Sequence, residues 1–378
     1  MIINNVKLVL ENEVVHGSLE VQDGEIRAFA ESQSCQPEAM DGEGGWLLPG
    51  LIELHTDNLD KFFTPRPKVD WPAHSAMSSH DALMVASGIT TVLDAVAIGD
   101  VRDGGDRLEN LEKMINAIEE TQKRGVNRAE HRLHLRCELP HHTTLPLFEK
   151  LVQREPVTLV SLMDHSPGQR QFANREKYRE YYQGKYSLTD AQMQQYEEEQ
   201  LALAARWSQP NRETIAAMCR ARHIALASHD DATHEHVAES HQLGSVIAEF
   251  PTTFEAAEAS RKHGMNVLMG APNIVRGGSH SGNVAASELA QLGLLDILSS
   301  DYSPASLLDA AFRVADDESN RFTLPQAVKL VTKNPAQALN LQDRGVIGEG
   351  KRADLVLAHR KGNHIHIDHV WRQGKRVF

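Results

Sequence analysis

The chain has 378 residues, of which 41% are hydrophobic and 24% are charged, an ordinary composition for a globular protein with a sizeable core. Its formal net charge is −13, from 39 Lys and Arg against 52 Asp and Glu. This charge argues against nucleic-acid binding, which requires a basic surface. A small anionic substrate remains compatible with it, because a local group of Arg and Lys can lie in an acidic protein.

The cysteines and the amino-terminal segment indicate the compartment. Cys35, Cys137 and Cys219 are odd in number and far apart, so we expect no disulfide framework and a reducing environment. The amino terminus lacks the basic start and apolar run of a signal peptide, and no apolar stretch is long enough to span a bilayer. We therefore expect a soluble, cytoplasmic protein with no membrane partner.

Both ends of the chain have the sequence pattern of short strands. Residues 1–48 alternate apolar and polar positions and contain Asp23-Gly24, a strong hairpin signal. Residues 343–378 show the same alternation. We expect the two ends to pair into one small β-sandwich domain, with 49–342 inserted between them as a unit.

The middle of the chain alternates short apolar runs with helical segments. The expected strands lie at 50–54, 90–96, 132–138, 157–163, 224–228, 246–250, 266–269 and 296–299. The expected helices lie at 107–123, 144–153, 212–222, 233–243, 253–263 and 283–292. Such alternation is typical of parallel βαβ units, and eight of them predict a (β/α)8 TIM barrel. An open doubly wound sheet is the alternative, but no G-x-G-x-x-G follows the first strand.

One stretch, 169–210, is too long for a simple loop and follows the fourth strand. It contains several basic residues and a predicted helix from Thr189, a cap with Gln192 three residues on, to Trp207. Its position places it over the active-site face, as a lid or a subunit contact. A family-specific insertion without a catalytic part is the alternative.

Ionisable residues recur where the expected strands end. In a parallel barrel these ends converge on one face, where imidazole nitrogens and carboxylate oxygens form a natural site for Zn²⁺ or Mn²⁺. His55 and Asp57 can reach one metal together, because residues two apart face the same side of a strand. The candidates are His55, Asp57, Glu138, His165, His229 and Asp301.

Six candidates exceed the three protein ligands of a typical catalytic zinc, so we expect two metals. Glu138 is the best candidate for a bridging carboxylate. We expect Asp301 to orient the attacking water and to shuttle its proton. Cys137 faces away from Glu138 on the same strand, so we expect it to pack in the core rather than act as a nucleophile.

A second set of residues has the character of an anion site. Arg beside a Gly-Gly-Ser turn can offer side-chain and backbone donors to phosphate oxygens, and loops after strands seven and eight often bind phosphate in TIM barrels. The alternative is that each Arg is a solvated surface residue. The candidates are Lys61, Arg66, Arg170, Asn273, Arg276, Ser279 and His280.

Several motifs together resemble the amidohydrolase superfamily. These are PGLIELHTD at 49–57, GITTV at 88–92, Asp301 after the eighth strand, and GVIGEGKRADLVL at 345–357. The resemblance covers the whole chain and implies a metal-dependent hydrolase. Most members carry H-x-H on strand one and many have a histidine on strand six, where this chain has Asp57 and Glu249. This departure leaves open whether Glu249 is a ligand or orients one.

More narrowly, HTDNLDK, DHSPGQ, SHDD and EFPTT resemble a phosphonate-degrading branch of that superfamily. The resemblance implies hydrolysis of the 5-triphosphate of a ribosyl 1-methylphosphonate, with water attacking the α-phosphorus and diphosphate leaving. Asp230 and Thr252, which follow the fifth and sixth expected strands, are further candidates for substrate binding. Homodimers are common in the superfamily, so a homodimer is compatible with the resemblance, but the sequence does not give the oligomeric state. The alternatives are hydrolysis of an amide, cyclic imide or nucleobase, and a scaffold subunit without catalysis.

Overall fold

The computed structural model describes residues 1–99, 104–279 and 281–378. The chain forms two compact units, each built from separate stretches of sequence. The first unit contains Met1–Asp94, Lys113–Arg132 and Met269–Phe378, and the second contains Ala95–Glu112 and Leu133–Leu268.

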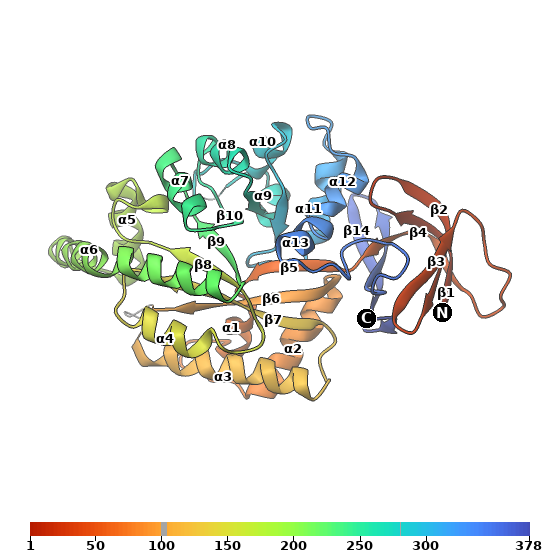
Figure 1. The fold of residues 1–378 in the computed structure, drawn as a ribbon, viewed down its shortest axis with the longest axis horizontal. Helices are drawn as coiled ribbons and strands as arrows, with labels where there is room; N and C mark the ends of the chain where they lie inside the picture. Colours follow the sequence, from red (N-terminus) through yellow and green to blue (C-terminus); the bar gives the residue numbers. More distant parts are fainter. Residues whose placement is uncertain (100–103, 280) are drawn as a thin grey trace. The chain divides into compact units, whose positions relative to one another are not determined.

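Eight strands, β5 to β12, form one sheet in which they follow one another in chain order (Figure 1). Their bounds are β5 Leu51–Thr56, β6 Ile89–Ile98, β7 Glu130–Glu138, β8 Val157–Met163, β9 Ala225–His229, β10 Ile247–Glu249, β11 Asn266–Gly270 and β12 Ile297–Ser299. A parallel backbone bridge between Thr56 and Asp301 brings the two edge strands of the sheet together, as in a closed barrel. The expected (β/α)8 fold is confirmed, and each strand matches its expected bounds to within two residues.

The barrel strands are buried on both faces. β5 has the sequence LIELHT and is buried at every position, and β8 is exposed only in part at Thr158. Near-continuous burial is typical of parallel strands that helices cover on one face and the barrel core on the other. Polar residues within these strands, such as Glu53 and His55, therefore lie in the interior and need polar partners there.

The two chain ends share a separate sheet of seven strands within the first unit, ordered β15-β14-β13-β4-β1-β2-β3. Figure 1 shows its amino-terminal strands in red beside the carboxy-terminal strands in blue. Their bounds are β1 Ile2–Val9, β2 Val14–Gln22, β3 Glu25–Ala30, β4 Met40–Pro49, β13 Leu355–Lys361, β14 His364–Arg372 and β15 Lys375–Arg376. The expected pairing of the two ends is found, because β4 pairs with both β1 and β13.

One apolar cluster stabilises this small sheet. It combines residues from both ends of the chain, including Leu8, Leu47, Leu355 and the fully buried Trp371. The predicted hairpin at Asp23-Gly24 is also present, with both residues at positive φ between β2 and β3, as a two-residue turn requires.

Helices follow most barrel strands. Apart from the insertion, they are α1 Asn58–Phe63, α2 Ala73–Ala86, α3 Gly104–Lys123, α4 Thr144–Leu151, α7 His234–Gln242, α8 Phe254–Lys262, α9 Ala271–Arg276, α10 Ala286–Gln291, α11 Ser306–Asp316, α12 Leu324–Lys329 and α13 Lys333–Ala338. Every expected helix overlaps one of the helices of the structure. Among the described residues, no helix is long and apolar enough to cross a membrane.

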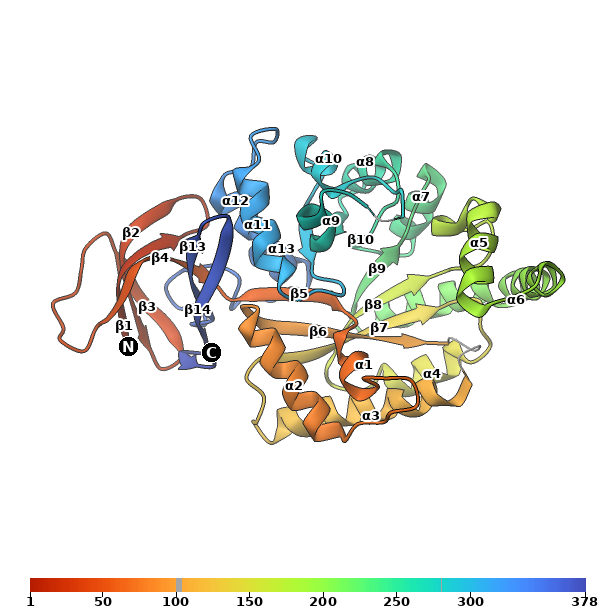
Figure 2. The same ribbon diagram turned by 180° about the vertical axis from the view of Figure 1, so that it is seen from behind.

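The segment after β8 forms two helices, α5 Arg175–Tyr186 and α6 Asp190–Ala221 (Figure 2). Thr189 and Gln192 form the predicted capping box at the start of α6. The expected break between 207 and 212 is wrong, because α6 continues through Pro210. Proline removes one helical hydrogen bond and clashes with the preceding turn, so tertiary contacts must hold this region. Asn211 makes such contacts, donating from its side chain to the carbonyls of Leu139 and His141.

Candidate metal centre

In the first unit, three ionisable side chains meet where the barrel closes. His55 lies at the end of β5 and is 1% exposed, and Asp57 follows two residues later. The Nε2 atom of His55 lies 3.9 Å from Asp57 Oδ2 and 3.9 Å from Asp301 Oδ1. Asp57 lies just beyond β5, at the start of α1, and the bridge between Thr56 and Asp301 holds Asp301 beside this segment.

A buried carboxylate, Glu53, accepts a hydrogen bond from the backbone of His55. Glu53, two residues earlier on β5, accepts hydrogen bonds from the His55 amide at 2.8 Å and the Ser300 amide at 2.6 Å. The Ser299 hydroxyl also lies 2.6 Å from this carboxylate. Burial raises the pKa of Glu53, and these hydrogen bonds oppose that rise. Glu53 thus ties β5 to β12, a role that the sequence analysis missed.

In the second unit, two histidines face one aspartate oxygen. His229 Nε2 lies 3.3 Å and His165 Nε2 lies 3.6 Å from Oδ2 of Asp230. The two rings stand nearly perpendicular, with their centroids 5.5 Å apart. Ligand atoms about 2.1 Å from a tetrahedral zinc lie roughly 3.4 Å from one another. The separations in this group therefore suit a shared cation.

Each of these histidines is oriented by a carboxylate on its other nitrogen. His165 Nδ1 lies 2.5 Å from Glu138 Oε1, and His229 Nδ1 lies 2.6 Å from Glu249 Oε1. This arrangement directs both Nε2 atoms toward Asp230. Carboxylates commonly fix the tautomer and orientation of metal-binding histidines in this way.

The same contacts shift the pKa values of His165 and Glu138. Burial alone would lower the pKa of His165, but the charge of Glu138 and the hydrogen bonds that the ring donates to Asp230 and Glu138 raise it to about 10. Burial alone would raise the pKa of Glu138, but His165 lowers it to about 2.

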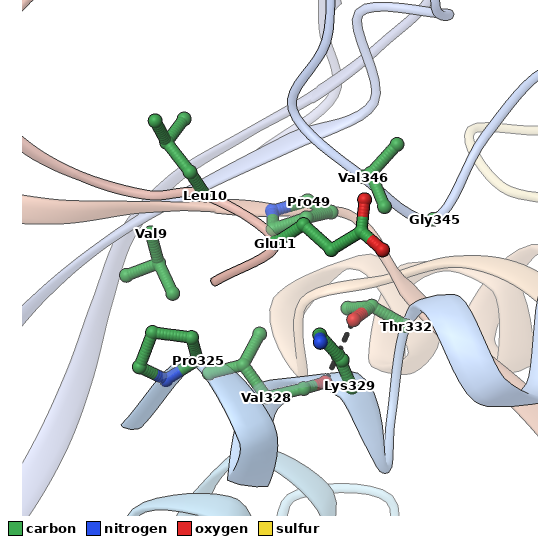
Figure 3. Close-up of a pocket in the computed structure, with 10 residues that line it drawn as sticks. All are labelled: Val9, Leu10, Glu11, Pro49, Pro325, Val328, Lys329, Thr332, Gly345 and Val346. Carbon is green, nitrogen blue, oxygen red and sulfur yellow. Dashed lines mark hydrogen bonds between the residues drawn. The ribbon is translucent and has the colours of Figure 1, made fainter. Parts of the chain in front are cut away.

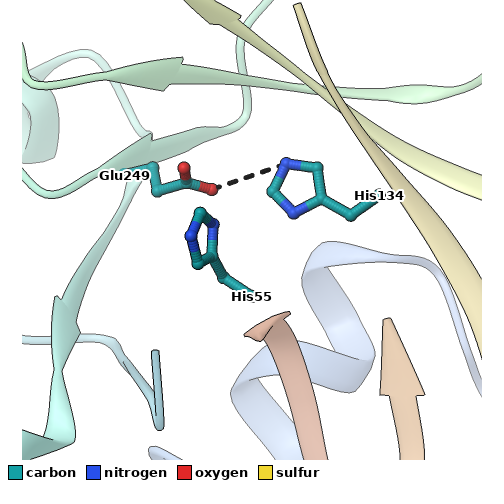
Figure 4. Close-up of side chains that lie close together, drawn as sticks. All are labelled: His55, His134 and Glu249. Atoms are coloured by element: carbon teal, nitrogen blue, oxygen red, sulfur yellow. Dashed lines mark ion pairs between the residues drawn. The ribbon is translucent and has the colours of Figure 1, made fainter. Parts of the chain in front are cut away.

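His134 is a further candidate that the sequence analysis missed. It is fully buried on β7, and its Nε2 atom lies 3.7 Å from Glu249 Oε2 and 2.9 Å from Ser161 Oγ. Figure 4 shows its ring facing Glu249; His55, also drawn there, belongs to the first unit. His134 is four residues before Glu138, on the same face of the strand, and this spacing could have signalled it.

The chemistry of both groups fits a divalent metal. Each combines imidazole nitrogen with carboxylate oxygen, the donors that Zn²⁺ and Mn²⁺ accept. His55, Asp57 and Asp301 form one candidate group, and His165, His229 and Asp230 form another. The carboxylates at Glu138 and Glu249 already engage histidine nitrogens, as residues that orient ligands do.

The residues expected to bind substrate have different environments. Arg170, Asp230 and Thr252 are buried. Lys61 donates to Asn58 Oδ1 and to the Tyr302 carbonyl, while Arg66 and Arg276 are exposed.

Two further residues of this set have hydrogen-bond partners in the segment that follows β11. Asn273 accepts a hydrogen bond from the Ala286 amide, and the Ser279 hydroxyl lies 3.0 Å from that of Ser281. His280 lies outside the described residues.

A small pocket elsewhere in the first unit lacks this chemistry (Figure 3). Its lining is mostly apolar and contains one carboxylate, Glu11, which pairs with Lys333. The hydrogen bond from Lys333 lowers the pKa of Glu11. The lining residues are Val9, Leu10, Glu11, Pro49, Pro325, Val328, Lys329, Thr332, Gly345 and Val346. Because they include no histidine, this pocket is not a candidate metal centre.

Comparison with known proteins defines the class. Residues 82–378 match the model of the amidohydrolase family, so the chain belongs to the amidohydrolase family, as its motifs indicated. Enzymes of this superfamily are metal-dependent, in keeping with the two groups of ligand-type residues.

A protein of Escherichia coli (strain K12), alpha-D-ribose 1-methylphosphonate 5-triphosphate diphosphatase, is 97% identical to this chain over 378 residues, the full length of both.

Solved structures with low sequence identity share the fold. A 5-methylcytosine deaminase from Klebsiella pneumoniae has a TM-score of 0.64 at 15% identity and covers 100% of this chain and 98% of its own. An N-acetylglucosamine-6-phosphate deacetylase from Thermotoga maritima has a TM-score of 0.58 at 15% identity, over 100% of this chain and 99% of its own. At such identities the likeness concerns the fold alone.

Proposed function

We propose that this chain hydrolyses α-D-ribose 1-methylphosphonate 5-triphosphate to α-D-ribose 1-methylphosphonate 5-phosphate and diphosphate. The observation that carries the proposal is the 97% identity, over the full length of both chains, to the E. coli diphosphatase. The donor groups of both units support it, since hydrolysis of a phosphoanhydride benefits from divalent metal ions.

We propose two metal ions, zinc or manganese, held by residues of these groups. In the first unit the ligands are His55 and Asp57, and in the second they are His165, His229 and Asp230. Glu138, which the sequence suggested as a bridge, and Glu249 then orient the histidines. Such ions supply Lewis-acid activation of water and of the phosphoryl oxygens.

The remaining chemistry falls to side chains of this chain. Asp301 is the proposed base that accepts a proton from the attacking water, because its carboxylate faces His55 and is partly exposed. Its exposure leaves room for water and substrate. Attack at the α-phosphorus then expels diphosphate as the leaving group.

Exposed basic residues complete the proposal. Lys61 and Arg276, with the Gly-Gly-Ser turn that follows Arg276, are the proposed contacts for the triphosphate oxygens. The positive charge of a guanidinium or ammonium group at these positions attracts the anionic triphosphate, which the net negative charge of the protein would otherwise repel.

The test is phosphorus NMR of the products formed in ¹⁸O-labelled water by metal-loaded protein. Diphosphate together with a 5-phosphate that carries the label supports hydrolysis at the α-phosphorus. Label in the diphosphate would place the attack at the β-phosphorus, and orthophosphate would place it at the terminal phosphorus. No reaction in protein shown to contain metal would contradict the proposal and favour an amide or nucleobase substrate.

A further inference from the structure

Two buried arginines lie in the second unit, against the loops that carry the candidate ligands. Arg170, in the loop after β8, and Arg212, on α6, are each 6% exposed. Burial of a charged group is costly unless that group is paired and hydrogen-bonded. The partners of these two arginines therefore indicate why they are buried.

Three carboxylates surround the two guanidinium groups. Arg170 Nε donates to Asp231 Oδ1 at 3.0 Å, and Arg212 Nη2 donates to Asp164 Oδ2 at 3.2 Å. Glu239, on α7, is shared, because its Oε1 lies 3.3 Å from Arg170 Nη2 and 3.6 Å from Arg212 Nε. The result is one continuous network, which we call the arginine clamp: Asp164, Arg170, Arg212, Asp231 and Glu239.

The clamp holds the immediate chain neighbours of two candidate ligands. Asp164 precedes His165, and Asp231 follows Asp230. His165 and Asp230 contact each other, whereas Asp164 and Asp231 contact the clamp arginines. The positions of Asp164 and Asp231 thus set the backbone from which the two ligand side chains extend.

Hydroxyl groups and backbone geometry reinforce this arrangement. The Ser240 hydroxyl donates to Asp231 Oδ2 at 2.8 Å, and Ser166 donates to Asp164 through its amide and hydroxyl. Arg170 has φ 43° and Asp230 has φ 55°, conformations that side-chain-bearing residues rarely adopt. Such backbone strain persists only where surrounding contacts over-determine it.

We infer that Arg170 and Arg212 are positioning residues, which fix His165 and Asp230 relative to each other rather than bind the substrate. The inference rests on the proposed function and differs from the sequence-based expectation, which placed Arg170 in the anion site. Its Nε and Nη2 donors already bind carboxylates in the interior, so its charge is compensated within the protein. Groups that support metal ligands typically change metal affinity or activity by about 10- to 100-fold when altered.

The experiment compares Arg170→Lys and Arg212→Lys, which keep the charge but lose the planar arrangement of donors. We expect kcat to fall about tenfold or more, while KM for the triphosphate stays within about twofold. A second readout is the chelator concentration that removes half of the bound metal, measured by elemental analysis. We expect this concentration to fall in both variants, because misplaced ligands hold the cation less tightly.

Two further variants keep the test decisive if a lysine variant folds poorly. Glu239→Gln neutralises the carboxylate that both arginines share, at a side chain that is 35% exposed and so tolerant of change. It should lower kcat and metal retention in the same direction. Arg222→Lys is the matched control, because Arg222 is an exposed residue that directly follows α6, the helix that carries Arg212. This variant should behave like the unaltered protein.

The outcomes separate this inference from the proposed function. A raised KM with unchanged kcat in Arg170→Lys would return Arg170 to the anion site and overturn the inference. Normal kcat and normal metal retention in both lysine variants would also overturn it. If the unaltered, metal-loaded protein releases no diphosphate, the proposed function fails instead, and metal retention still tests the clamp.

Discussion

Three residues that follow barrel strands adopt an unusual backbone conformation. Asp230 follows β9 with φ 55°, Phe250 follows β10 with φ 54°, and Asp301 lies two residues after β12 with φ 52°. This left-handed region is uncommon for residues other than glycine, and strain of this kind concentrates at functional sites. Two of the three carry carboxylates of the candidate metal centre, so local strain and proposed chemistry coincide.

Asp301 provides the first prediction at this scale. Asp301→Asn keeps the shape of the side chain but removes a base, so kcat should fall by about 10²-fold or more. Bound metal, measured by elemental analysis, should stay close to that of the unaltered protein. Asp309→Asn, which alters a partly buried carboxylate paired with Arg313 on α11, is the control. Normal turnover in Asp301→Asn would remove it from the proton-transfer role.

Arg276 provides the second prediction. Its guanidinium is exposed at the end of α9, just before the Gly-Gly-Ser turn. Arg276→Ala should raise KM for the triphosphate about tenfold with little change in kcat, because a lost phosphate contact weakens substrate and transition state alike. Steady-state kinetics beside Arg321→Ala, another exposed arginine, gives the comparison. An unchanged kcat/KM would exclude Arg276 from the anion site.

At the scale of elements, a second buried network joins α2 to β6 and β7 in the first unit. Asp94, on β6, lies 2.6 Å from His80 Nε2 and 2.9 Å from His131 Nδ1. Asp81, on α2, lies 2.9 Å from His131 Nε2 and also accepts the amide of Ala129. Both nitrogens of the His131 ring thus face carboxylates. Hydrogen-bond distances account for this cluster without a metal ion.

The network predicts a pH dependence of stability. Burial alone would lower the pKa of His131, but Asp94 and Asp81 raise it from 6.5 to about 9. A group whose pKa is raised in the folded state stabilises it fully below its unfolded pKa, so this contribution is complete below pH 6.5. It is lost as the pH rises through about 9, and its size is about 3 kcal/mol.

Urea denaturation between pH 6 and pH 10 measures this contribution as a difference between two proteins. The free energy of unfolding should exceed that of His131→Asn by an amount that shrinks as the pH rises through 9. His16→Asn, at an exposed histidine of the small sheet, should show no such change. A constant difference across this range would show that His131 carries no proton in the folded protein.

At the scale of the whole molecule, metal binding should couple activity to stability. Removal of metal by a chelator should reduce turnover by more than about 100-fold, since such ions supply several kcal/mol of transition-state stabilisation. It should also lower Tm, because a ligand that binds only the folded state stabilises it. Zinc or manganese should restore both quantities, which activity assays and calorimetry can follow. Full activity in protein shown to be metal-free would contradict the proposed chemistry.

Much of the architecture follows from local pattern. Continuous apolar runs such as VTLVSLM predict buried parallel strands, because only residues covered on both faces can dispense with polar alternation. The Thr189 cap and the Asp23-Gly24 turn are likewise decided within a few residues. These features depend on neighbours in the chain, so the sequence by itself determined them.

The tertiary structure decided which distant side chains meet. The sequence around Arg170 is compatible with a phosphate contact, and only the packing of α7 and the β9 loop against it supplies Glu239 and Asp231. His134 looked like an ordinary strand residue until β10 placed Glu249 beside it. Pro210 should end a helix by its local chemistry, yet α6 continues through it, and the neighbouring Asn211 donates hydrogen bonds to carbonyls of another segment. In each case polar groups that are removed from water must pair with partners far along the chain. Local pattern does not encode such pairing.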